Sequence, residues 1–372
     1  MPEIVLKNVK KVFGNKFVAV DNLDMYIADR SFITLLGPSG CGKTTTLRMI
    51  AGLETPTEGE ITIDGVTVFH ADKGINLPPD KRDVGFLFQN YALWPHMTVY
   101  KNIAFGLENL KWPKKQIEER VGELLDMLKI RPFVDRYPSE LSGGQQQRVA
   151  IARTLAPKPK VLFMDEPLSN LDAKLRGEMR TELKRLHVDT NSTFIYVTHD
   201  QLEAMTLSTK VCLIESGKLQ QFAPPLEIYQ RPENLFVADF MGNPTMNFLP
   251  AKVLEKSEES LDLEFHGRRL RFHAGGSFTG DVRSEVILGI RPEYVTLCGD
   301  GKLEASVYTT LPTGMETTVR IMLDGELISA VVFGCVDYPV DAPVRFAFAG
   351  ENILVFDKES GKRVGVGELT AV

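Results

Sequence analysis

Two short glycine-rich segments carry the residue types that could do chemistry in this chain. The first reads Gly37-Pro38-Ser39-Gly40-Cys41-Gly42-Lys43-Thr44 and fits the spacing G-x-x-x-x-G-K-[ST]. The second reads Leu141-Ser142-Gly143-Gly144-Gln145, and taken alone it predicts only a helix start, because Ser and Gly are good N-cap residues. The first segment therefore predicts a loop that holds phosphate, and the meaning of the second depends on what surrounds it.

The flanks of the first segment are those that a phosphate-binding loop requires. An apolar run from Phe32 to Leu36 precedes it, and a helical pattern follows it. Backbone N–H groups and a helix N-terminus can then face phosphate oxygens, with Lys43 at the β- and γ-phosphates and Thr44 on Mg²⁺. We expect ATP and Mg²⁺ as ligands. The nucleotide set in this loop is Ser39, Gly40, Cys41, Gly42, Lys43, Thr44 and Thr45. The alternative is a glycine-rich turn without a ligand.

An acidic pair lies at the end of the segment Val161–Glu166. Four apolar residues in a row are typical of a strand buried on both faces of a parallel sheet. Asp165 and Glu166 follow at its end, where open α/β sheets bind ligands. Asp165 could hold Mg²⁺, and Glu166 could polarise the water that attacks the γ-phosphate. Without the phosphate loop, a solvated Asp-Glu pair would be the better interpretation.

These motifs occur together and in a definite order. Leu141–Gln145 continues into Gln146–Arg153 and stands just before the Asp165-Glu166 strand. With this arrangement the chain resembles the ATPase subunit of ATP-binding-cassette (ABC) transporters, and more closely the maltose/glycerol-3-phosphate importer ATPases of bacteria and archaea. The resemblance covers nearly the whole chain, including Asn243–Asn247 and Gly289–Glu293.

The resemblance implies an α/β fold of the P-loop NTPase class. Residues 1–240 would form the ABC ATPase domain, with a RecA-like core, an antiparallel β-subdomain and a helical subdomain over about residues 90–137. Residues 241–372 would form a β-rich, barrel-like regulatory domain of the oligonucleotide/oligosaccharide-binding (OB) type. In the sequence itself, short β-like runs separated by turn signals favour such a barrel. These runs are 286–290, 305–308, 317–322, 327–333, 344–348 and 353–356.

The resemblance also implies roles for single residues. Glu166, His199 and Gln89 would be catalytic, and Thr44, Gln89 and Asp165 would hold Mg²⁺. Phe13 would stack on adenine, and the alternative for Phe13 is a core residue. Asp172, in Ser169–Asp172, would belong to a segment that crosses between subunits. Alone, a Gln or a His at a strand end would indicate nothing of the kind.

The same resemblance also implies a role for the second glycine segment. Two copies would pair head-to-tail, so that Ser142, Gly143, Gly144 and Gln145 of one copy cover the ATP of the other. The further partners would be two transmembrane permease subunits, an extracytoplasmic solute-binding protein acting indirectly, and a regulatory protein on the C-terminal domain. The permease would grip the helical subdomain near Tyr91–Met97. Trp94 in that stretch could equally pack internally.

The implied function is hydrolysis of ATP to drive carbohydrate uptake, of an oligosaccharide, a disaccharide or a glycerol-phosphate solute. Two alternatives stay open: an importer of iron, polyamine or sulfate, and a non-transport ABC ATPase. The chain has no run of 18 apolar residues and no signal segment at its start, which favours a location on the cytoplasmic face of the membrane, reached through partners.

Charge and cysteine content exclude other classes. The net charge is −6, and residues 241–372 hold all of the acidic excess, so a nucleic-acid partner for the barrel is disfavoured. The four cysteines are widely spaced, which argues against disulfides and metal clusters. Cys41 lies within the phosphate loop, so thiol reagents should block ATP binding. Residues Phe69 to Leu77 are expected to form an expanded loop.

Overall fold

The computed structural model describes residues 3–14, 16–280 and 282–371. It divides into two compact units, Met1–Pro225 and Leu226–Val372. Helices α7 (Pro225–Gln230) and α8 (Leu235–Phe240) precede the barrel strands. Ala238 of α8 packs in a cluster with Leu354 and Phe356, so α8 belongs to the second unit by packing. The boundary by packing thus comes earlier than the 240/241 boundary expected from the sequence.

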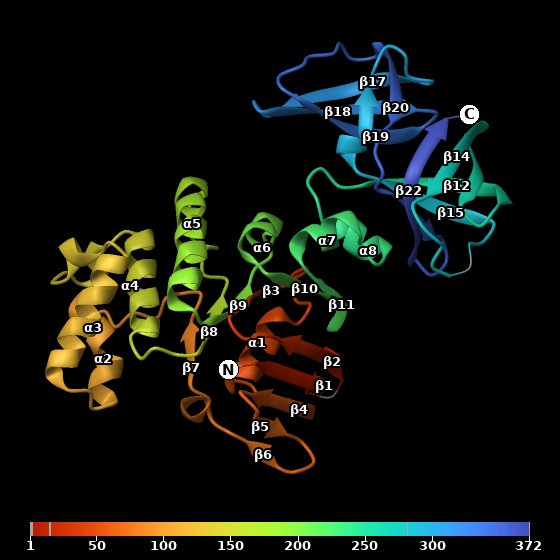
Figure 1. Ribbon diagram of the computed structural model, residues 1–372. Coiled ribbons are helices and arrows are strands. Elements are labelled where there is room, and N and C mark those ends of the chain that lie inside the picture. Colours follow the sequence, from red (N-terminus) through yellow and green to blue (C-terminus); the bar gives the residue numbers. More distant parts are fainter. Residues whose placement is uncertain (1–2, 15, 281, 372) are drawn as a thin grey trace. The chain divides into compact units, whose positions relative to one another are not determined.

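A mixed sheet forms the centre of the first unit (Figure 1), in the order β11-β10-β3-β9-β8-β7. All neighbours pair in parallel except β10 and β11, which are antiparallel. Its strands are β3 (Phe32–Leu36), β7 (Val84–Leu87), β8 (Val161–Asp165), β9 (Thr193–Val197), β10 (Lys210–Glu215) and β11 (Lys218–Ala223).

Strands β3, β8 and β9 are buried along their whole length, as their apolar runs predict. Their side chains alternate between two cores because successive residues of a strand face opposite sides. In β8, Leu162 and Met164 join the core that contains the long helices, whereas Phe163 joins the core on the other face. Packing on both faces therefore holds the sheet in place and fixes where these strands end.

An antiparallel sheet and the helix α1 (Lys43–Ala51) cover one face of this centre and share one core with it. The antiparallel order is β2-β1-β4-β5-β6. These strands are β1 (Ile4–Phe13), β2 (Phe17–Ile27), β4 (Glu58–Ile63), β5 (Val66–His70) and β6 (Ile75–Asn76). The expectation of an expanded loop over residues 69–77 was wrong, since β5 and β6 pair as a hairpin.

Helices α2 to α6 of the first unit pack in the core on the other face. Helices α2 (Val99–Asn109), α3 (Lys114–Met127) and α4 (Gly143–Leu155) gather at one side of the unit (Figure 1). Helices α5 (Ala173–Thr190) and α6 (Gln201–Leu207) follow β8 and β9. Apolar residues at helical spacing along α3 and just after it are buried, and they are Ile117, Val121, Leu124, Leu125 and Leu128.

The segment after β7 is tied to helix α4. Arg153 of α4 donates to the carbonyl oxygens of Tyr91 and Ala92 at 2.8 and 2.6 Å, and both of these residues have positive φ. Trp94 packs on Phe105 at 4.3 Å between ring centroids, with the Arg153 guanidinium 4.7 Å from the Trp94 ring. Internal packing therefore accounts for much of the Trp94 surface.

The second unit combines a closed barrel with a smaller sheet. The barrel order is β12-β13-β14-β22-β21-β15, and the sheet order is β16-β20-β17-β18-β19. Every β-like run expected from the sequence in this region lies within a strand. The strands are β12 (Asn247–Lys256), β13 (Ser260–Phe265), β14 (Arg268–Ala274), β15 (Glu285–Ile290), β16 (Val295–Leu297), β17 (Leu303–Pro312), β18 (Glu316–Leu323), β19 (Glu326–Phe333), β20 (Pro343–Phe348), β21 (Ile353–Asp357) and β22 (Arg363–Ala371).

A buried arginine holds the far end of the phosphate-loop helix. Arg82 donates through Nη1 to the carbonyl oxygens of Met49 and Ile50 at 2.9 and 2.8 Å, and through Nε to that of Leu77 at 2.8 Å. Burial lowers the pKa of Arg82 to about 10, so the group stays charged at neutral pH. Its positive charge satisfies carbonyls at the C-terminus of α1, where cations are favourable.

Replacing Arg82 by Met should therefore destabilise the first unit. We expect a loss of about 2–4 kcal/mol, because several buried carbonyls would lose their donor, and a fall of roughly 5 °C or more in the thermal unfolding midpoint. Circular dichroism on heating measures it. Lys81→Met, at the exposed neighbouring residue, is the matched control and should leave the midpoint within about 1 °C. Equal midpoints for the two variants would contradict the assignment.

Candidate nucleotide site

The phosphate loop occupies the turn between β3 and α1, and its shape depends on glycine. Gly42 has a φ of 105°, and a Cβ added there would lie 2.3 Å from the carbonyl oxygen of Ala19. A Cβ on Gly37 would lie 2.1 Å from the carbonyl oxygen of Ile214. No side chain fits at either position, so the loop backbone packs directly against neighbouring backbone. Its remaining N–H groups lie at the N-terminus of α1, where anions are favoured.

Lys43 and Thr44 lie at the start of α1 and face different groups. The Lys43 ammonium donates to the carbonyl oxygens of Gly37 and Pro38 at 2.7 and 2.8 Å. Thr44 Oγ1 donates to Asp165 Oδ1 at 2.9 Å, across from the end of β8. The sequence pairing of phosphate loop and acidic strand is thus a direct contact, which joins two hard oxygen groups of the kind that Mg²⁺ prefers.

Arg48 also contacts Asp165, and the sequence motifs did not predict this residue. Its Nη2 lies 3.4 Å from Asp165 Oδ2, and the Asp165 side chain is only 7% exposed. Arg48 follows Thr44 at a spacing of one helical turn, so both project from one face of α1. The spacing of four residues between Thr44 and Arg48 is the sequence signal that could have revealed this contact. Asp165 is therefore held by a hydroxyl and a guanidinium, from one helix.

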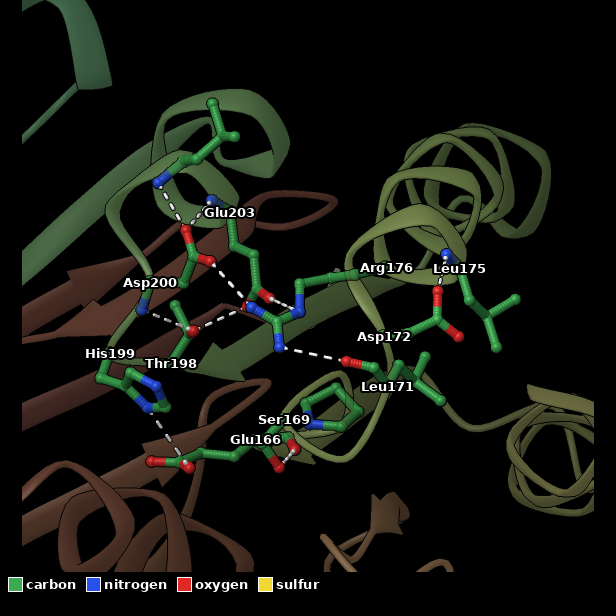
Figure 2. A network of polar contacts seen from close by, with 12 residues as sticks. Glu166, Ser169, Leu171, Asp172, Leu175, Arg176, Thr198, His199, Asp200 and Glu203 are labelled. Atoms are coloured by element: carbon green, nitrogen blue, oxygen red, sulfur yellow. Dashed lines mark hydrogen bonds and ion pairs between the residues drawn. The ribbon is translucent and has the colours of Figure 1, made fainter. Parts of the chain in front are cut away.

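Glu166 and His199 follow two adjacent strands and meet at the sheet edge. The pairing of Asp165 with Val197 sets β8 and β9 in register, so both turns begin at the same level. The Glu166 N–H donates to the carbonyl of Val197 at 3.1 Å, and Glu166 has a φ of 45°. His199 Nδ1 lies 3.5 Å from Glu166 Oε2 (Figure 2). The left-handed backbone turns the Glu166 carboxylate toward His199.

Gln89 joins the same edge from β7. Its Nε2 donates to Ser169 Oγ at 3.3 Å, and Ser169 Oγ donates to the carbonyl of Glu166 at 2.9 Å. Asn170 Nδ2 donates to the carbonyl of Gln89 at 3.3 Å. The structure therefore brings the segments of Gln89, Glu166 and His199 together, although they are far apart in the sequence.

Ser142 begins helix α4 in a capping box. Its Oγ accepts the N–H of Gln145 at 3.4 Å, and its own N–H donates to Gln145 Oε1 at 2.9 Å. Gly143 is exposed, whereas Gly144 is buried and a Cβ there would lie 2.6 Å from Leu175 Cδ2. Within the described residues, no hydrogen bond or ion pair joins this segment to the phosphate loop.

Asp172 and Phe13 have simpler surroundings. Asp172 caps α5, where its Oδ1 accepts the N–H of Leu175 at 3.0 Å. Phe13 ends β1 with a ring that is 39% exposed, so it is no core residue. Lys11 Nζ lies 4.7 Å from the centre of this ring and also donates to the carbonyl of Thr55 at 2.7 Å. A cation on one face leaves the other face for a second flat group.

Comparisons with known proteins identify this arrangement. Residues 20–169 match the family model described as ABC transporter, and residues 242–295 match the one described as MalK OB fold domain. The chain is 44% identical to a trehalose/maltose import ATP-binding protein of Thermococcus litoralis, over 98% of this chain and 100% of the relative. The chain belongs to the ABC transporter family. An sn-glycerol-3-phosphate import ATP-binding protein of a Ruegeria species is also 44% identical, over 98% and 99%.

Solved structures agree with the family assignment of the first unit. A structure described as cbiO1 of Clostridium perfringens, part of the ABC transporter complex cbiONQ, has a TM-score of 0.56 and 28% identity, over 60% of this chain and 89% of its own. A dimeric ATP-binding cassette in a post-hydrolysis state, bound to ADP and Pi, has a TM-score of 0.52 and 33% identity, over 60% and 98%. The chain is an ABC ATPase, and its cassette domain binds nucleotide.

One further observation concerns the membrane. Among residues 3–14, 16–280 and 282–371, no helix combines the length and the apolar character that crossing a bilayer requires.

Cys41 gives a test of the loop geometry. Its side chain is buried, and this burial raises the pKa of its thiol, so little reactive thiolate forms at neutral pH. In a Cys298→Ser/Cys335→Ser variant, we expect maleimide labelling of Cys41 to be slow at pH 7 and to rise about tenfold per pH unit up to pH 9. ATP should slow it further. Mass spectrometry measures the labelling.

The matched comparison is wild-type Cys335, which is exposed and should label faster at pH 7. Equal rates for Cys41 and Cys335, or no protection by ATP, would contradict the buried loop geometry.

Proposed function

We propose that this chain is the ATP-hydrolysing subunit of an ABC importer that takes up a carbohydrate or a glycerol phosphate. The observation that carries the proposal is the junction of Thr44, Asp165, Glu166 and His199 at one edge of the sheet. Relatives that are 44% identical over the whole chain are import ATP-binding proteins for trehalose/maltose and for sn-glycerol-3-phosphate. The same relatives support a place at the membrane through permease subunits.

The phosphate loop would bind the nucleotide. Backbone N–H groups of Ser39 to Thr45 would contact the phosphates, and Lys43 would exchange its two carbonyl contacts for the β- and γ-phosphate oxygens. Phe13 would stack on adenine with its free face, because Lys11 holds the other face.

The metal position is supported by the oxygen groups at the loop. Thr44 and Asp165 lie in contact, and Gln89 reaches the same edge through Ser169. Within the described residues no cluster of three His, Cys, Asp or Glu side chains could hold a metal ion unaided. This fits Mg²⁺, which is usually bound by one or two protein groups together with substrate phosphates. When bound, Mg²⁺ would neutralise charge on those phosphates.

Hydrolysis would depend on Glu166 and His199. The Glu166 carboxylate would accept the proton of a water that attacks the γ-phosphate in line. His199 would orient Glu166 across their 3.5 Å separation and contact the γ-phosphate from the side of β9. Thr44, Lys43 and the loop N–H groups would stabilise the charge on the departing ADP.

The second half of each site would come from another copy. Ser142 is exposed at the N-terminus of α4, and Gly143 carries no side chain that could hinder a phosphate. In a head-to-tail pair, Ser142 to Gln145 would close over the ATP of the other copy. ATP would then favour the closed pair, because it adds contacts only there. The dimeric cassette among the similar structures supports this arrangement.

Glu166→Gln tests the assignment of the base. The amide cannot accept the proton, so we expect ATP hydrolysis to fall roughly 100-fold or more while ATP binding persists. Because hydrolysis reopens the pair, this variant should accumulate as an ATP-dependent dimer, which size-exclusion chromatography with light scattering measures. Glu178→Gln, an exposed position on α5, is the control and should keep wild-type turnover. Robust turnover by Glu166→Gln would remove Glu166 from the mechanism.

Reconstitution tests the solute class. In proteoliposomes that hold the chain with its two membrane subunits, we expect ATP hydrolysis to rise when the binding protein carries maltose, trehalose or glycerol 3-phosphate. Iron, spermidine and sulfate serve as competing solutes. A rise with one of these competing solutes alone would contradict the carbohydrate assignment and leave the ATPase assignment intact.

A further inference from the structure

Arg176 joins two turns of the candidate site. It lies in the first turn of α5, where its N–H donates to the carbonyl of Asp172 at 2.9 Å. Its Nη2 donates to the carbonyl of Leu171 at 3.2 Å, and its Nη1 donates to Asp200 Oδ2 at 3.4 Å (Figure 2). One guanidinium therefore connects the Leu171–Asp172 turn to the turn that carries His199.

The His199 turn is held on both of its sides. Thr198 Oγ1 accepts the N–H of Asp200 at 3.0 Å and donates to Glu203 Oε2 at 2.6 Å. Asp200 Oδ1 caps α6 by accepting two backbone N–H groups at 2.8 and 3.1 Å. The backbone before and after His199 is thus fixed by side chains, while the imidazole itself is 58% exposed and projects toward Glu166.

Glu203 is the anchor of this network. Its side chain is only 4% exposed, and its Oε2 also accepts the hydroxyl of Tyr196 at 2.7 Å. Burial raises the pKa of Glu203, whereas the hydrogen bonds from Thr198 and Tyr196 and the charge of Arg176 act to lower it. Arg176 is the cation paired with it, since its Nε lies 4.0 Å from Glu203 Oε1.

The contact between Arg176 and Glu203 is incomplete. Arg176 Nε is buried and has no hydrogen-bond partner, although it lies next to a carboxylate oxygen. A separation of 4.0 Å is too long for a hydrogen bond, and a buried donor without a partner is unfavourable. A small movement of the guanidinium would close this contact, so the network has a second arrangement within reach.

We propose that Arg176 is a positioning residue, which sets the His199 turn according to the position of the Leu171–Asp172 turn. The proposal rests on the proposed function and on the expectation from the family resemblance that the segment of Asp172 crosses between subunits. That copy would fix the Leu171 carbonyl, and Arg176 would transmit the position to Asp200 and Glu203. His199 would then be oriented for the γ-phosphate only when the second copy is in place.

A plain packing role for Arg176 is the competing explanation, and the chain offers a matched control for it. Lys184 also projects from α5 and donates to the carbonyl oxygens of Thr206 and Leu207 at 2.8 and 3.3 Å, at the far end of α6. Both cations tie α5 to the α6 region, but only Arg176 contacts the His199 turn. If packing alone mattered, Arg176→Ala and Lys184→Ala would have similar effects.

The test is the ATPase rate of the full-length chain with Arg176→Ala, Arg176→Lys or Lys184→Ala, each made in wild type and in His199→Ala. Phosphate release in single turnover resolves slow rates. We expect Arg176→Ala to lower kcat at least about tenfold with KM for ATP within about twofold, and Arg176→Lys to recover part of the loss. Lys184→Ala should stay within about twofold of wild type. In the His199→Ala background, Arg176→Ala should lower kcat by less than about twofold, because Arg176 acts through His199, which this background already lacks.

Several results would overturn the inference. These are equal losses from Arg176→Ala in the two backgrounds, equal effects of Arg176→Ala and Lys184→Ala, or a change confined to KM. If Arg176→Ala does not fold, Arg176→Lys in the two backgrounds gives the same comparison. A wild-type chain that hydrolyses no ATP would contradict the proposed function instead, so the two failures are distinguishable.

Discussion

The shared carboxyl edge of four parallel strands is the constraint on which the rest of the first unit depends. Strands β3, β7, β8 and β9 run side by side in parallel, and their register is fixed because both faces of the sheet are buried. Val197 pairs with both Leu35 and Asp165, so the phosphate loop, the acidic pair and the histidine turn all leave the sheet at one level. Chemistry that needs groups from distant parts of the sequence can therefore assemble without a long loop.

Hydrogen bonds and ion pairs of three arginine side chains then hold the segments at this edge in place. Arg82 anchors the C-terminus of α1, and Arg48 contacts Asp165 Oδ2 while Thr44 contacts Oδ1. Arg176 joins the Leu171–Asp172 turn to the turn that carries His199. A planar guanidinium can serve two or three acceptors at once, which suits it to joining separate segments of backbone.

Much of this arrangement could be predicted from the sequence. The strand–loop–helix around Lys43, the buried β8 and six strands of the second unit, β15 and β17 to β21, follow from residue pattern. The fold class was implied by the family resemblance, and family membership is confirmed by the comparisons. The hairpin at β5 and β6 was not predicted, since β6 has only two residues and too little pattern to detect. The contacts of Arg82 with α1 and of Arg176 with Leu171 were missed because their partners are backbone carbonyls, which leave no trace in residue type. Gly144 was assigned to phosphate contact, yet its close packing on Leu175 needs glycine for a structural reason as well.

The central claim is that each ATP site is formed by two copies of the chain, and a mixing experiment tests it most directly. Lys43→Ala removes the phosphate-loop half and Ser142→Arg removes the capping half, each in a Glu166→Gln background that retains bound ATP. In a mixture of the two, a pair that contains one copy of each has one site with both halves intact. The account predicts no retained ATP for either variant alone and about one ATP per mixed dimer, measured with radiolabelled ATP. A mixture that retains no ATP, or single variants that retain it as well as the parent, would contradict the claim.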